Sequence, residues 1–404
     1  MYFENVIEKL DEKNKVALLD AIYMTKKELV QSVHTSSIKQ LTGADKRWYT
    51  YVPDASRKNN RKEIKRKTEK EIIEYLLEFY GLDGMTFIEL FNEYIPYKTK
   101  HTGSLQTIRR HRQHFEKYFV NGKSILLNMN IAKIDHLTLQ EEANRLVKTY
   151  KMTQKEWKNV RTFFFGMFRY AYDKHWITID PTEKVKITVQ FRQEEKKTAK
   201  TEVFKTTEYK RLHDYLDVQY LLTHDPAYLA VKLQFYTGLR IGELVALRWE
   251  NVDLCNKELK VNSMESNEPR IGSDGKFHDN IVIVNHTKNY LNRTIAILPQ
   301  AIEIFDELMV HTQNCSGFVF TRDGVRITER QYTYILERYA ELNDLPVKRS
   351  HKIRKTYASR LNGNKVPTDT IRRDLGHKHL TTTETYIYDP NDDEETYELK
   401  AKAV

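Results

Sequence analysis

The amino-acid sequence predicts a multidomain, mostly α-helical protein that also carries small β-sheets. Its 404 residues are enough for two to four domains. Apolar residues recur at helical spacing through residues 86–182 and again from about residue 207. Short strand-like runs interrupt the helices: RWYTYVP early in the chain, and KELKV, NIVIVN and RTIAIL later. We therefore expect an α+β domain, an all-α domain, and a mainly helical domain with a small antiparallel β-sheet.

The composition favours a basic, intracellular protein. The formal net charge is +10, which suits a polyanionic partner, although charge alone equally fits a generic basic protein. Two cysteines, Cys255 and Cys315, form neither a disulfide framework nor a zinc site, which indicates a reducing compartment. No secretory signal is visible at the N-terminus, and no apolar run approaches the roughly 18 residues that span a bilayer. We expect a cytoplasmic protein without a membrane partner.

Residues 1–39 are expected to be a helical N-terminal extension, and the sequence gives no indication of its role. Residues 40–82 predict a small α+β domain with the strand RWYTYVP, a turn at Asn59–Asn60, a second strand and the helix EKEIIEYLLEFY. Residues 44–70 hold ten lysines and arginines against four acids, a net charge of +6. Basic strands of this kind fit a DNA groove. The alternative is a solvated charged segment beside a linker, which the aromatic strand and the helix disfavour. The predicted DNA contacts here are Arg47, Arg57, Lys58, Arg61, Lys62, Lys65, Arg66 and Lys67.

Residues 83–184 are predicted to form an all-α domain. Its first helix opens at Thr86, because Glu89 stands three residues later in a capping-box pattern. The helix SLQTIRRHRQHFEKYF has an apolar face, and Arg109, Arg110 and Arg112 lie on its other faces. These arginines are predicted to contact the DNA backbone, although a merely solvated face explains any one of them almost as well. Residues 185–205 are polar and lack periodicity, which predicts an extended linker.

Residues 206–390 are predicted to form a mainly helical domain with the strands KELKV, NIVIVN and RTIAIL, and residues 391–404 a short tail. Helices are expected to continue to Tyr388, because Pro390 prevents much further extension. Six residues of this domain supply chemistry for breaking a phosphodiester bond: cations for the phosphate oxygens, a base and an acid. The set is Arg240, Lys288, His351, Arg354, His377 and Tyr386.

The residue types suggest a role for each member of the set. Tyr386 is the candidate nucleophile, and Tyr388 is a competing candidate. The guanidinium groups of Arg240 and Arg354 fit phosphate oxygens bidentately. Glu243 lies three residues after Arg240 and is predicted to hold that side chain in place.

The two histidines and the lysine complete the set. His351 lies three residues before Arg354 on one predicted helix and is the candidate base, while His377 fits a hydrogen-bond donor to the phosphate. Either histidine alone is more often a structural or surface residue. Lys288, expected in the turn between NIVIVN and RTIAIL, is the candidate acid for the leaving oxygen, although single lysines in hairpins usually face solvent.

Taken together, TGLRIGEL, HKIR and LGHKHLTTTETY resemble the motifs of the tyrosine recombinase (phage integrase) family. The nine-residue step from His377 selects Tyr386 over Tyr388, and Lys288 lies five residues before Arg293, at the position of the family's lysine. The resemblance covers about residues 205–390. Less specifically, residues 86–182 resemble the family's core-binding domain, and residues 40–80 resemble the arm-type DNA-binding domain of mobile-element integrases.

The resemblance implies a site-specific recombinase that cleaves and rejoins DNA through a 3′-phosphotyrosine intermediate. It further implies a homotetramer on double-stranded attachment sites of core and arm type, a Holliday junction, and no metal ion or cofactor. It is also compatible with an accessory directionality factor and with association with the nucleoid. Two other functions remain open: a type IB topoisomerase-like enzyme that relaxes DNA, and a non-catalytic DNA-binding regulator. A complete catalytic set argues against the regulator.

Overall fold

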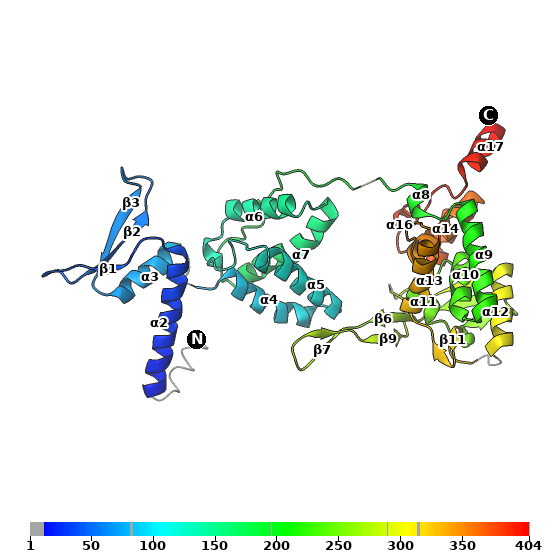
Figure 1. Cartoon of the computed structure of the whole chain (residues 1–404), viewed down its shortest axis with the longest axis horizontal. Coiled ribbons are helices and arrows are strands. Elements are labelled where there is room, and N and C mark those ends of the chain that lie inside the picture. Colours follow the sequence, from blue (N-terminus) through cyan, green and yellow to red (C-terminus); the bar gives the residue numbers. More distant parts are fainter. Residues whose placement is uncertain (1–11, 81–83, 195, 289, 313–315, 404) are drawn as a thin grey trace. The chain divides into compact units, whose positions relative to one another are not determined.

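The computed structural model describes residues 12–80, 84–194, 196–288, 290–312 and 316–403. The chain divides into two compact units, residues 1–194 (unit 1) and residues 195–404 (unit 2). Both units are rich in helices and carry small antiparallel sheets (Figure 1), as the sequence predicts. Among the described residues, no helix combines the length and the apolar character that crossing a bilayer requires.

Unit 1 begins with a small α+β fold. Strands β1 (Lys39–Gln40), β2 (Trp48–Pro53) and β3 (Arg61–Arg66) form an antiparallel sheet in that order. Helix α3 (Glu69–Tyr80) covers one face of this sheet with its apolar stripe. Because side chains alternate along a strand, Val52 and Ile64 face the helix, whereas Tyr51, Arg61 and Lys65 lie on the opposite face. The buried residues of this core are Val30, Val52, Ile64, Ile72, Ile73, Leu76 and Leu77.

Helix α2 (Glu12–Val33) belongs to the same small fold, which corrects the expectation of a separate extension over residues 1–39. Tyr23 on α2 donates a 3.1 Å hydrogen bond to Glu69 of α3. His34, just after α2, lies 2.6 Å from the Thr50 hydroxyl of β2. The sequence periodicity revealed the helix but not its partners. Residues 1–11 lie outside the described part of the chain.

The second part of unit 1 is all-α. Thr86 caps helix α4 (Phe87–His101) in a capping box with Glu89, as predicted. Aromatic side chains dominate the core, with the ring of Phe87 within 6 Å of those of Phe164 and Phe168. The expected boundary at 82/83 falls in the undescribed segment 81–83. The other helices of this part are α5 (Leu105–Phe115), the π-helix η1 (Glu116–Val120), the 3-10 helix η2 (Ile131–Lys133), α6 (His136–Thr149) and α7 (Gln154–Asp173).

The linker predicted over residues 185–205 is attached to folded structure at both ends. Thr188 and Asn144 exchange two hydrogen bonds, and Arg192 donates to the Lys151 carbonyl, which fixes this stretch to unit 1. At the other end, helix α8 (Ala199–Glu202) begins unit 2, and Val203 is fully buried. Only residues between these anchors fit the expected extended linker. The sequence did not predict these attachments, because hydrogen bonds between polar residues leave no hydrophobic pattern in a sequence.

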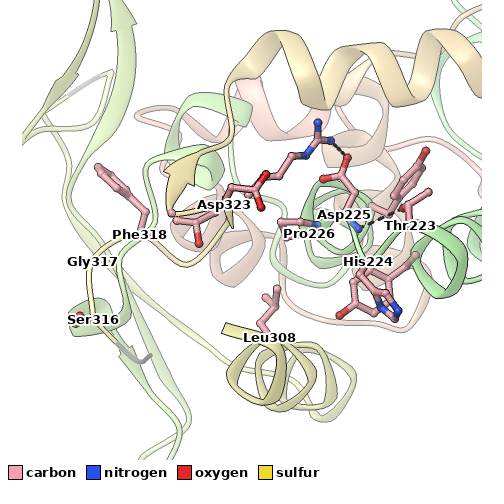
Figure 2. Close-up of a pocket in the computed structure, with 14 residues that line it drawn as sticks. Thr223, His224, Asp225, Pro226, Leu308, Ser316, Gly317, Phe318 and Asp323 are labelled. Carbon is pink, nitrogen blue, oxygen red and sulfur yellow. Dashed lines mark hydrogen bonds and ion pairs between the residues drawn. The ribbon is translucent and has the colours of Figure 1, made fainter. Parts of the chain in front are cut away.

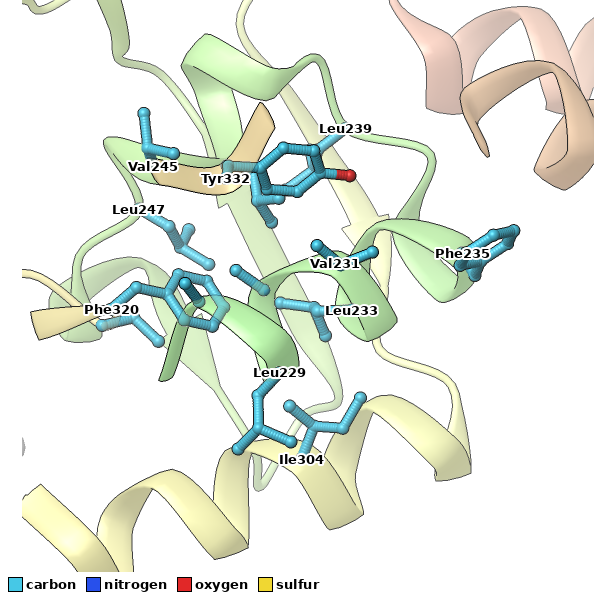
Figure 3. Close-up of a cluster of buried hydrophobic side chains, with 14 of the residues drawn as sticks. Leu229, Val231, Leu233, Phe235, Leu239, Val245, Leu247, Ile304, Phe320 and Tyr332 are labelled. Carbon is cyan, nitrogen blue, oxygen red and sulfur yellow. The ribbon is translucent and has the colours of Figure 1, made fainter. Parts of the chain in front are cut away.

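Unit 2 is built around helix α10 (Pro226–Thr237), whose side chains are buried on nearly every side. Figure 3 shows Leu229, Val231 and Leu233 of α10 among the buried side chains of the core. A helix surrounded in this way forms the rigid centre from which the surrounding elements are positioned. The surrounding helices are α9 (Thr206–Thr223), α11 (Ile241–Val245), η3 (Trp249–Asn251), α12 (Pro299–Thr312), α13 (Glu329–Leu342), α14 (Ser350–Gly363) and α15 (Thr368–Leu375).

The strands of unit 2 pair differently from the expectation. Strand β10 (Arg293–Ala296) pairs with β5 (Glu258–Val261), and β5 pairs with β4 (Val252–Asp253). Strand β9 (Ile281–Val284) instead pairs with β6 (Met264–Asn267), in a ribbon that Figure 1 shows extending from the helices of unit 2. Lys288 therefore lies in a connection between two sheets and not in a hairpin turn. The remaining short pairs are β7 (Arg270–Ile271) with β8 (Phe277–His278) and β11 (Thr321–Arg322) with β12 (Val325–Arg326).

The end of the chain also differs from the expectation. Helix α16 (Leu380–Glu384) stops before Tyr386, which occupies a turn, so the helices do not continue to Tyr388. The segment expected to be a short mixed tail forms helix α17 (Asp393–Ala403), which buries none of its residues. Pro390 lies between the two helices, but α16 has already ended at Glu384, so the proline is not what terminates it.

Candidate active site

All six predicted catalytic residues line one pocket of about 510 Å³ in unit 2. They come from five separate places in the sequence. These are the α10–α11 turn, the β9–β10 connection, helix α14, the residue after the α15 cap, and the turn after α16. The described lining residues are Gln234, Arg240, Ile241, Lys288, Ser350, His351, Arg354, His377, Lys378, His379, Thr382 and Tyr386.

A tight turn between α10 and α11 positions Arg240. Gly238 caps α10 with φ +60°, and a Cβ atom there would lie 2.3 Å from the Tyr357 ring, so only glycine fits. Gln234 stabilises the turn by donating a 2.7 Å hydrogen bond to the Leu239 carbonyl. Arg240 then caps α11, with its side chain partly exposed to the pocket.

A buried carboxylate organises the arginines beside the pocket. Glu243 accepts hydrogen bonds from the Arg240 guanidinium at 2.9 Å and from Arg293 Nη2 at 2.7 Å. Burial alone would raise the pKa of Glu243. The hydrogen bonds and charge of Arg293, followed by the charges of Arg354 and Arg240, outweigh burial and lower that pKa to about 2. Glu243 therefore stays ionised and holds Arg240, as the sequence predicted.

Arg293 was not predicted to be a site residue, although its position in the sequence was used to locate Lys288. It stands on β10 with its side chain 8% exposed, and its Nε donates a 2.6 Å hydrogen bond to the Asp374 carbonyl. It also lies against Gly376, where a Cβ atom would approach its Nη1 to 3.0 Å. Arg293 thus joins Glu243 to the turn that carries His377. One feature of the sequence could have indicated this role: Arg293 is a charged residue within the alternating strand RTIAIL.

Arg354 is the most deeply buried member of the set, with 1% of its surface exposed. Its Nη1 donates a 2.6 Å hydrogen bond to the Gly238 carbonyl, and its Nη2 donates to the Leu375 carbonyl. Burial and then the charge of Arg240 lower the pKa of Arg354 to about 9, so it is still a cation at neutral pH. Among the described residues, its Nε has no hydrogen-bond partner, which leaves a donor for an anion in the pocket.

The two histidines flank Tyr386. The ring centroids of His351 and His377 lie 4.9 and 4.6 Å from that of Tyr386, both at steep interplanar angles. Partial burial, together with the cations Lys355 and Arg354, lowers the pKa of His351 to about 4. Burial and then Arg354 and Arg240 lower the pKa of His377 to about 3. Both rings are therefore neutral near pH 7, as a general base and a neutral hydrogen-bond donor require.

The main chain around Tyr386 is fixed to helix α14. The Ser359 hydroxyl donates a 3.1 Å hydrogen bond to the Tyr386 carbonyl and accepts one of 3.0 Å from the Tyr388 amide. The ring of Tyr386 lines the pocket, and Lys355 Nζ lies 5.6 Å from its centroid. The competing candidate, Tyr388, is not among the pocket's lining residues, and its ring packs 5.0 Å from the same ammonium.

Helix α14 is also tied to the beginning of unit 2. Glu202 of α8 is buried and pairs with both Lys352 and Lys355 of α14. Lys288 completes the pocket wall from the β9–β10 connection, with an exposed side chain that is not constrained by a hairpin.

The predicted DNA-contacting residues of unit 1 do not belong to this pocket. On the small sheet, Arg61 stacks 4.6 Å from the Tyr51 centroid and Lys65 pairs with Glu63 at 3.0 Å. The remaining predicted positions on this fold are Arg47 paired with Asp45, Arg57 paired with Asp54, Arg66 stacked on Tyr75, and the exposed Lys58, Lys62 and Lys67.

Helix α5 presents its arginines as the sequence pattern suggested. Ile108 and Phe115 are buried, whereas Arg110 and Arg112 are exposed and Arg109 is half-buried.

A larger pocket of about 950 Å³ lies elsewhere in unit 2 (Figure 2). The α9–α10 turn and residues 316–318 and 321–324 line it, and Arg322 pairs there with Asp225. It contains none of the six predicted residues. Its charged lining residues are the Arg322–Asp225 pair and Asp323, which leave no excess positive charge for a phosphate. Within the described parts of the chain, no group of three or more His, Cys, Asp or Glu side chains is arranged to hold a metal ion.

Known proteins similar to this chain agree with the family that its sequence motifs resemble. The model of the phage integrase family matches residues 202–392. A tyrosine recombinase XerC-like protein of Caldanaerobacter subterraneus subsp. tengcongensis is 27% identical over 354 residues, covering 82% of this chain and 88% of that protein.

Two solved structures share the fold. The Tn1549 transposon integrase in complex with a circular intermediate DNA aligns with a TM-score of 0.56 at 17% identity, covering 79% of this chain and all of that one. A lambda integrase tetramer bound to a Holliday junction aligns with a TM-score of 0.56 at 13% identity, covering 85% of this chain and 93% of that one.

The fold and the family match define a DNA-recombining enzyme of the site-specific class. Residues 202–392 belong to the phage integrase family, and the relatives of the whole chain include tyrosine recombinases. The family and the mostly helical fold with small antiparallel sheets are therefore as the sequence predicted.

Proposed function

We propose that this recombinase integrates or excises a mobile genetic element by cleaving DNA through a 3′-phosphotyrosine intermediate. One observation carries the proposal: a tyrosine, two neutral histidines, two arginines and a lysine from five separate segments line a single pocket. Neither composition nor helix packing requires that convergence. A phosphodiester is the anion for which such a set supplies clamp, base and acid together.

The proposed reaction begins with attack by the Tyr386 hydroxyl oxygen on the scissile phosphorus. The His351 imidazole takes the phenolic proton, and the bond between phosphorus and the 5′ oxygen breaks as the tyrosyl ester forms. The Lys288 ammonium gives a proton to the departing oxygen, which leaves as a 5′-hydroxyl. Rejoining reverses these transfers with a 5′-hydroxyl from the partner strand. Because the ester conserves the bond energy, the reaction needs no nucleotide cofactor.

The arginines would stabilise the extra charge that develops on the non-bridging oxygens. Arg354 offers its unpartnered Nε, and Arg240 is oriented by Glu243. These groups are already fixed by carbonyls and a carboxylate, so little reorganisation is needed when DNA binds. His377 would donate one further hydrogen bond to the same oxygens.

Unit 1 is proposed to bind DNA away from the scissile phosphate. The small sheet displays Tyr51, Arg61 and Lys65 on the face opposite its core, which suits contacts to an arm-type site. The arginines of α5 suit the backbone of the core-type site. The solved relative on a Holliday junction is a tetramer, and we propose the same assembly for this chain on its two sites. The protein would then work in the cytoplasm at the nucleoid, with an accessory directionality factor as a further proposed partner.

The decisive experiment uses a suicide substrate, a candidate attachment site nicked near the cleavage position so that the 5′-hydroxyl fragment diffuses away. The wild-type chain should accumulate a covalent protein–DNA adduct. Tyr386→Phe should abolish the adduct, whereas Tyr388→Phe should leave it, because Tyr388 lies outside the pocket lining. An adduct that survives Tyr386→Phe would overturn the assignment of the nucleophile. Relaxation of a plasmid that lacks any attachment site would instead indicate the type IB topoisomerase-like function.

A further inference from the structure

His377 is held in the pocket by one side-chain hydrogen bond. Its Nδ1 lies 3.0 Å from the hydroxyl oxygen of Thr383. Both residues are buried, with 3% of His377 and none of Thr383 exposed. On the other side of the ring, Nε2 is buried and has no hydrogen-bond partner among the described residues, while the residue lines the pocket beside Tyr386. The ring therefore has one nitrogen anchored in the protein and the other available to a ligand.

The direction of this hydrogen bond decides which nitrogen carries the proton. Threonines inside the longer helices donate to the carbonyl one turn back, as Thr356 does to Lys352 and Thr237 does to Leu233. Thr383 stands on the short helix α16 and, in the described structure, makes no such bond to a carbonyl. Its hydroxyl proton therefore has Nδ1 as its acceptor. The reverse bond would leave a buried hydroxyl proton without an acceptor, which is unfavourable.

We propose that Thr383 is a positioning residue that fixes neutral His377 in the tautomer with its proton on Nε2. This rests on the proposed function, because the Nε2–H group then becomes the donor to a non-bridging oxygen of the scissile phosphate. A neutral imidazole has only one N–H group, so the opposite tautomer would present a lone pair to the phosphate and repel it. The three cations around the ring, Arg354, Arg240 and Arg293, help to keep it neutral.

Thr383 also orients the nucleophile. Its carbonyl accepts a 2.9 Å hydrogen bond from the Tyr386 amide, which begins the turn that carries the phenol into the pocket. One residue thus connects the phosphate donor to the segment of the nucleophile. The side-chain bond can be removed by mutation while this backbone bond remains, which makes the proposal testable.

The test compares Thr383→Val, which keeps the shape but loses the hydroxyl, with Thr383→Ser, which keeps the hydroxyl. Thr381→Val, on the exposed side of the same helix, is the matched control. The first measurement is the histidine side-chain nitrogen NMR spectrum of the free full-length chain, labelled only at histidine. The His377 signals are assigned by their loss in His377→Gln. We expect the Nε2–H tautomer in wild type and in Thr383→Ser, and a mixture of tautomers in Thr383→Val.

The second measurement is the rate of adduct formation on the nicked site. Thr383→Val should cleave more slowly by on the order of tenfold to a hundredfold. This is less than the roughly hundredfold to thousandfold loss seen when an oriented donor to a reacting oxyanion is removed outright, because the His377 ring still populates the donor tautomer in part. Thr383→Ser and Thr381→Val should stay within about twofold of wild type. A wild-type Nδ1–H tautomer, or wild-type cleavage by Thr383→Val, overturns the proposal.

Failure of the proposed function is a separate result. If wild type forms no adduct at Tyr386, the NMR spectrum still decides whether Thr383 sets the tautomer. If Thr383→Val does not fold, as judged by its circular dichroism, the wild-type and Thr383→Ser spectra decide the question, because an Nδ1–H signal in either one contradicts the assigned donor.

Discussion

At the scale of single residues, the pocket combines exposed and buried cations with different tasks. Arg240 is partly exposed and pairs with Glu243, whereas Arg354 is buried and bonded to two carbonyls. The exposed arginine can adjust to the phosphate, and the buried one is fixed in advance. A guanidinium differs from an ammonium here because its planar fork holds several N–H donors in fixed directions, so the carboxylate that binds one side also orients the side that faces the phosphate.

Arg240→Lys should therefore impair cleavage severely. Lysine keeps the charge but loses the planar fork, so we expect the rate of adduct formation to fall on the order of a hundredfold or more. The measurement is a single-turnover time course on the nicked site. Arg330→Lys, at an arginine whose side chain is 81% exposed on α13, is the control and should not change the rate. Near-normal cleavage by Arg240→Lys would contradict the clamp role.

Burial of His377 also makes stability depend on pH. The pKa of His377 is about 3 in the folded chain, against about 6.5 for an ordinary histidine. Below pH 6.5 the unfolded chain binds a proton that the folded chain does not, so stability falls as pH drops through the window from 6.5 towards 3.

His377→Gln should flatten this dependence. Between pH 7 and pH 5, its free energy of unfolding should decline by about 2 kcal/mol less than that of wild type, the value expected for one such histidine. Urea unfolding at both pH values, followed by circular dichroism, measures the difference. His175→Gln, at an exposed position of unit 1, is the comparison, and an equal change in both variants would contradict the burial argument.

At the scale of elements, helix α14 is the element that supports most of the site. It carries His351 and Arg354, and through Ser359 it also fixes the turn that holds Tyr386. Its ion pairs with Glu202 attach it to α8, where the chain enters unit 2. The nucleophile is therefore not on the helix that the sequence pattern suggested, but on a turn that is held by a neighbouring helix.

Ser359→Ala tests this attachment. The change removes the two hydrogen bonds to Tyr386 and Tyr388, each worth about 1 kcal/mol, and should free the turn. We expect adduct formation to slow by on the order of tenfold, since about 1.4 kcal/mol corresponds to a factor of ten. Ser273→Ala, in the exposed β7–β8 turn, should cleave normally. A rate for Ser359→Ala within twofold of wild type would show that the turn needs no such support.

At the scale of the whole molecule, each chain builds a complete site from its own residues. Tyr386 lies in the same pocket as the arginines, histidines and lysine of its own unit 2. A tetramer would then contain four self-sufficient pockets, and cleavage would take place in cis. Assembly would control when each site acts without having to supply a residue to it.

Mixing two inactive variants distinguishes cis from trans cleavage. Tyr386→Phe lacks the nucleophile, and Arg240→Gln lacks part of the phosphate clamp. If cleavage is in cis, a mixture of the two should form no adduct on the nicked site. If a protomer donated its tyrosine to a neighbour, Tyr386 of the Arg240→Gln chain would attack a phosphate held by the intact clamp of the other chain. Recovery of adduct in the mixture would therefore rule out the cis arrangement.

The amino-acid sequence alone determined the residue types, their order and most of the elements that carry them. Periodicity predicted the small sheet at RWYTYVP and the helix α10, and the Thr86 capping box located the start of α4. These features depend on neighbours within a few residues, which a linear pattern records. The catalytic set was found for a different reason, because its spacing resembles that of a known family.

Only the tertiary structure decided how those residues are supported. Arg293 reaches Glu243 and the Asp374 carbonyl across 50 and 81 residues of sequence, and such contacts leave no periodic signal. The same holds for the pairing of β9 with β6, which removes Lys288 from the expected hairpin, and for the packing of α2 against α3. Hydrophobic patterns report which face of an element is buried, but not which distant partner buries it. That choice is made by the simultaneous packing of all the elements, and so it appears only in three dimensions.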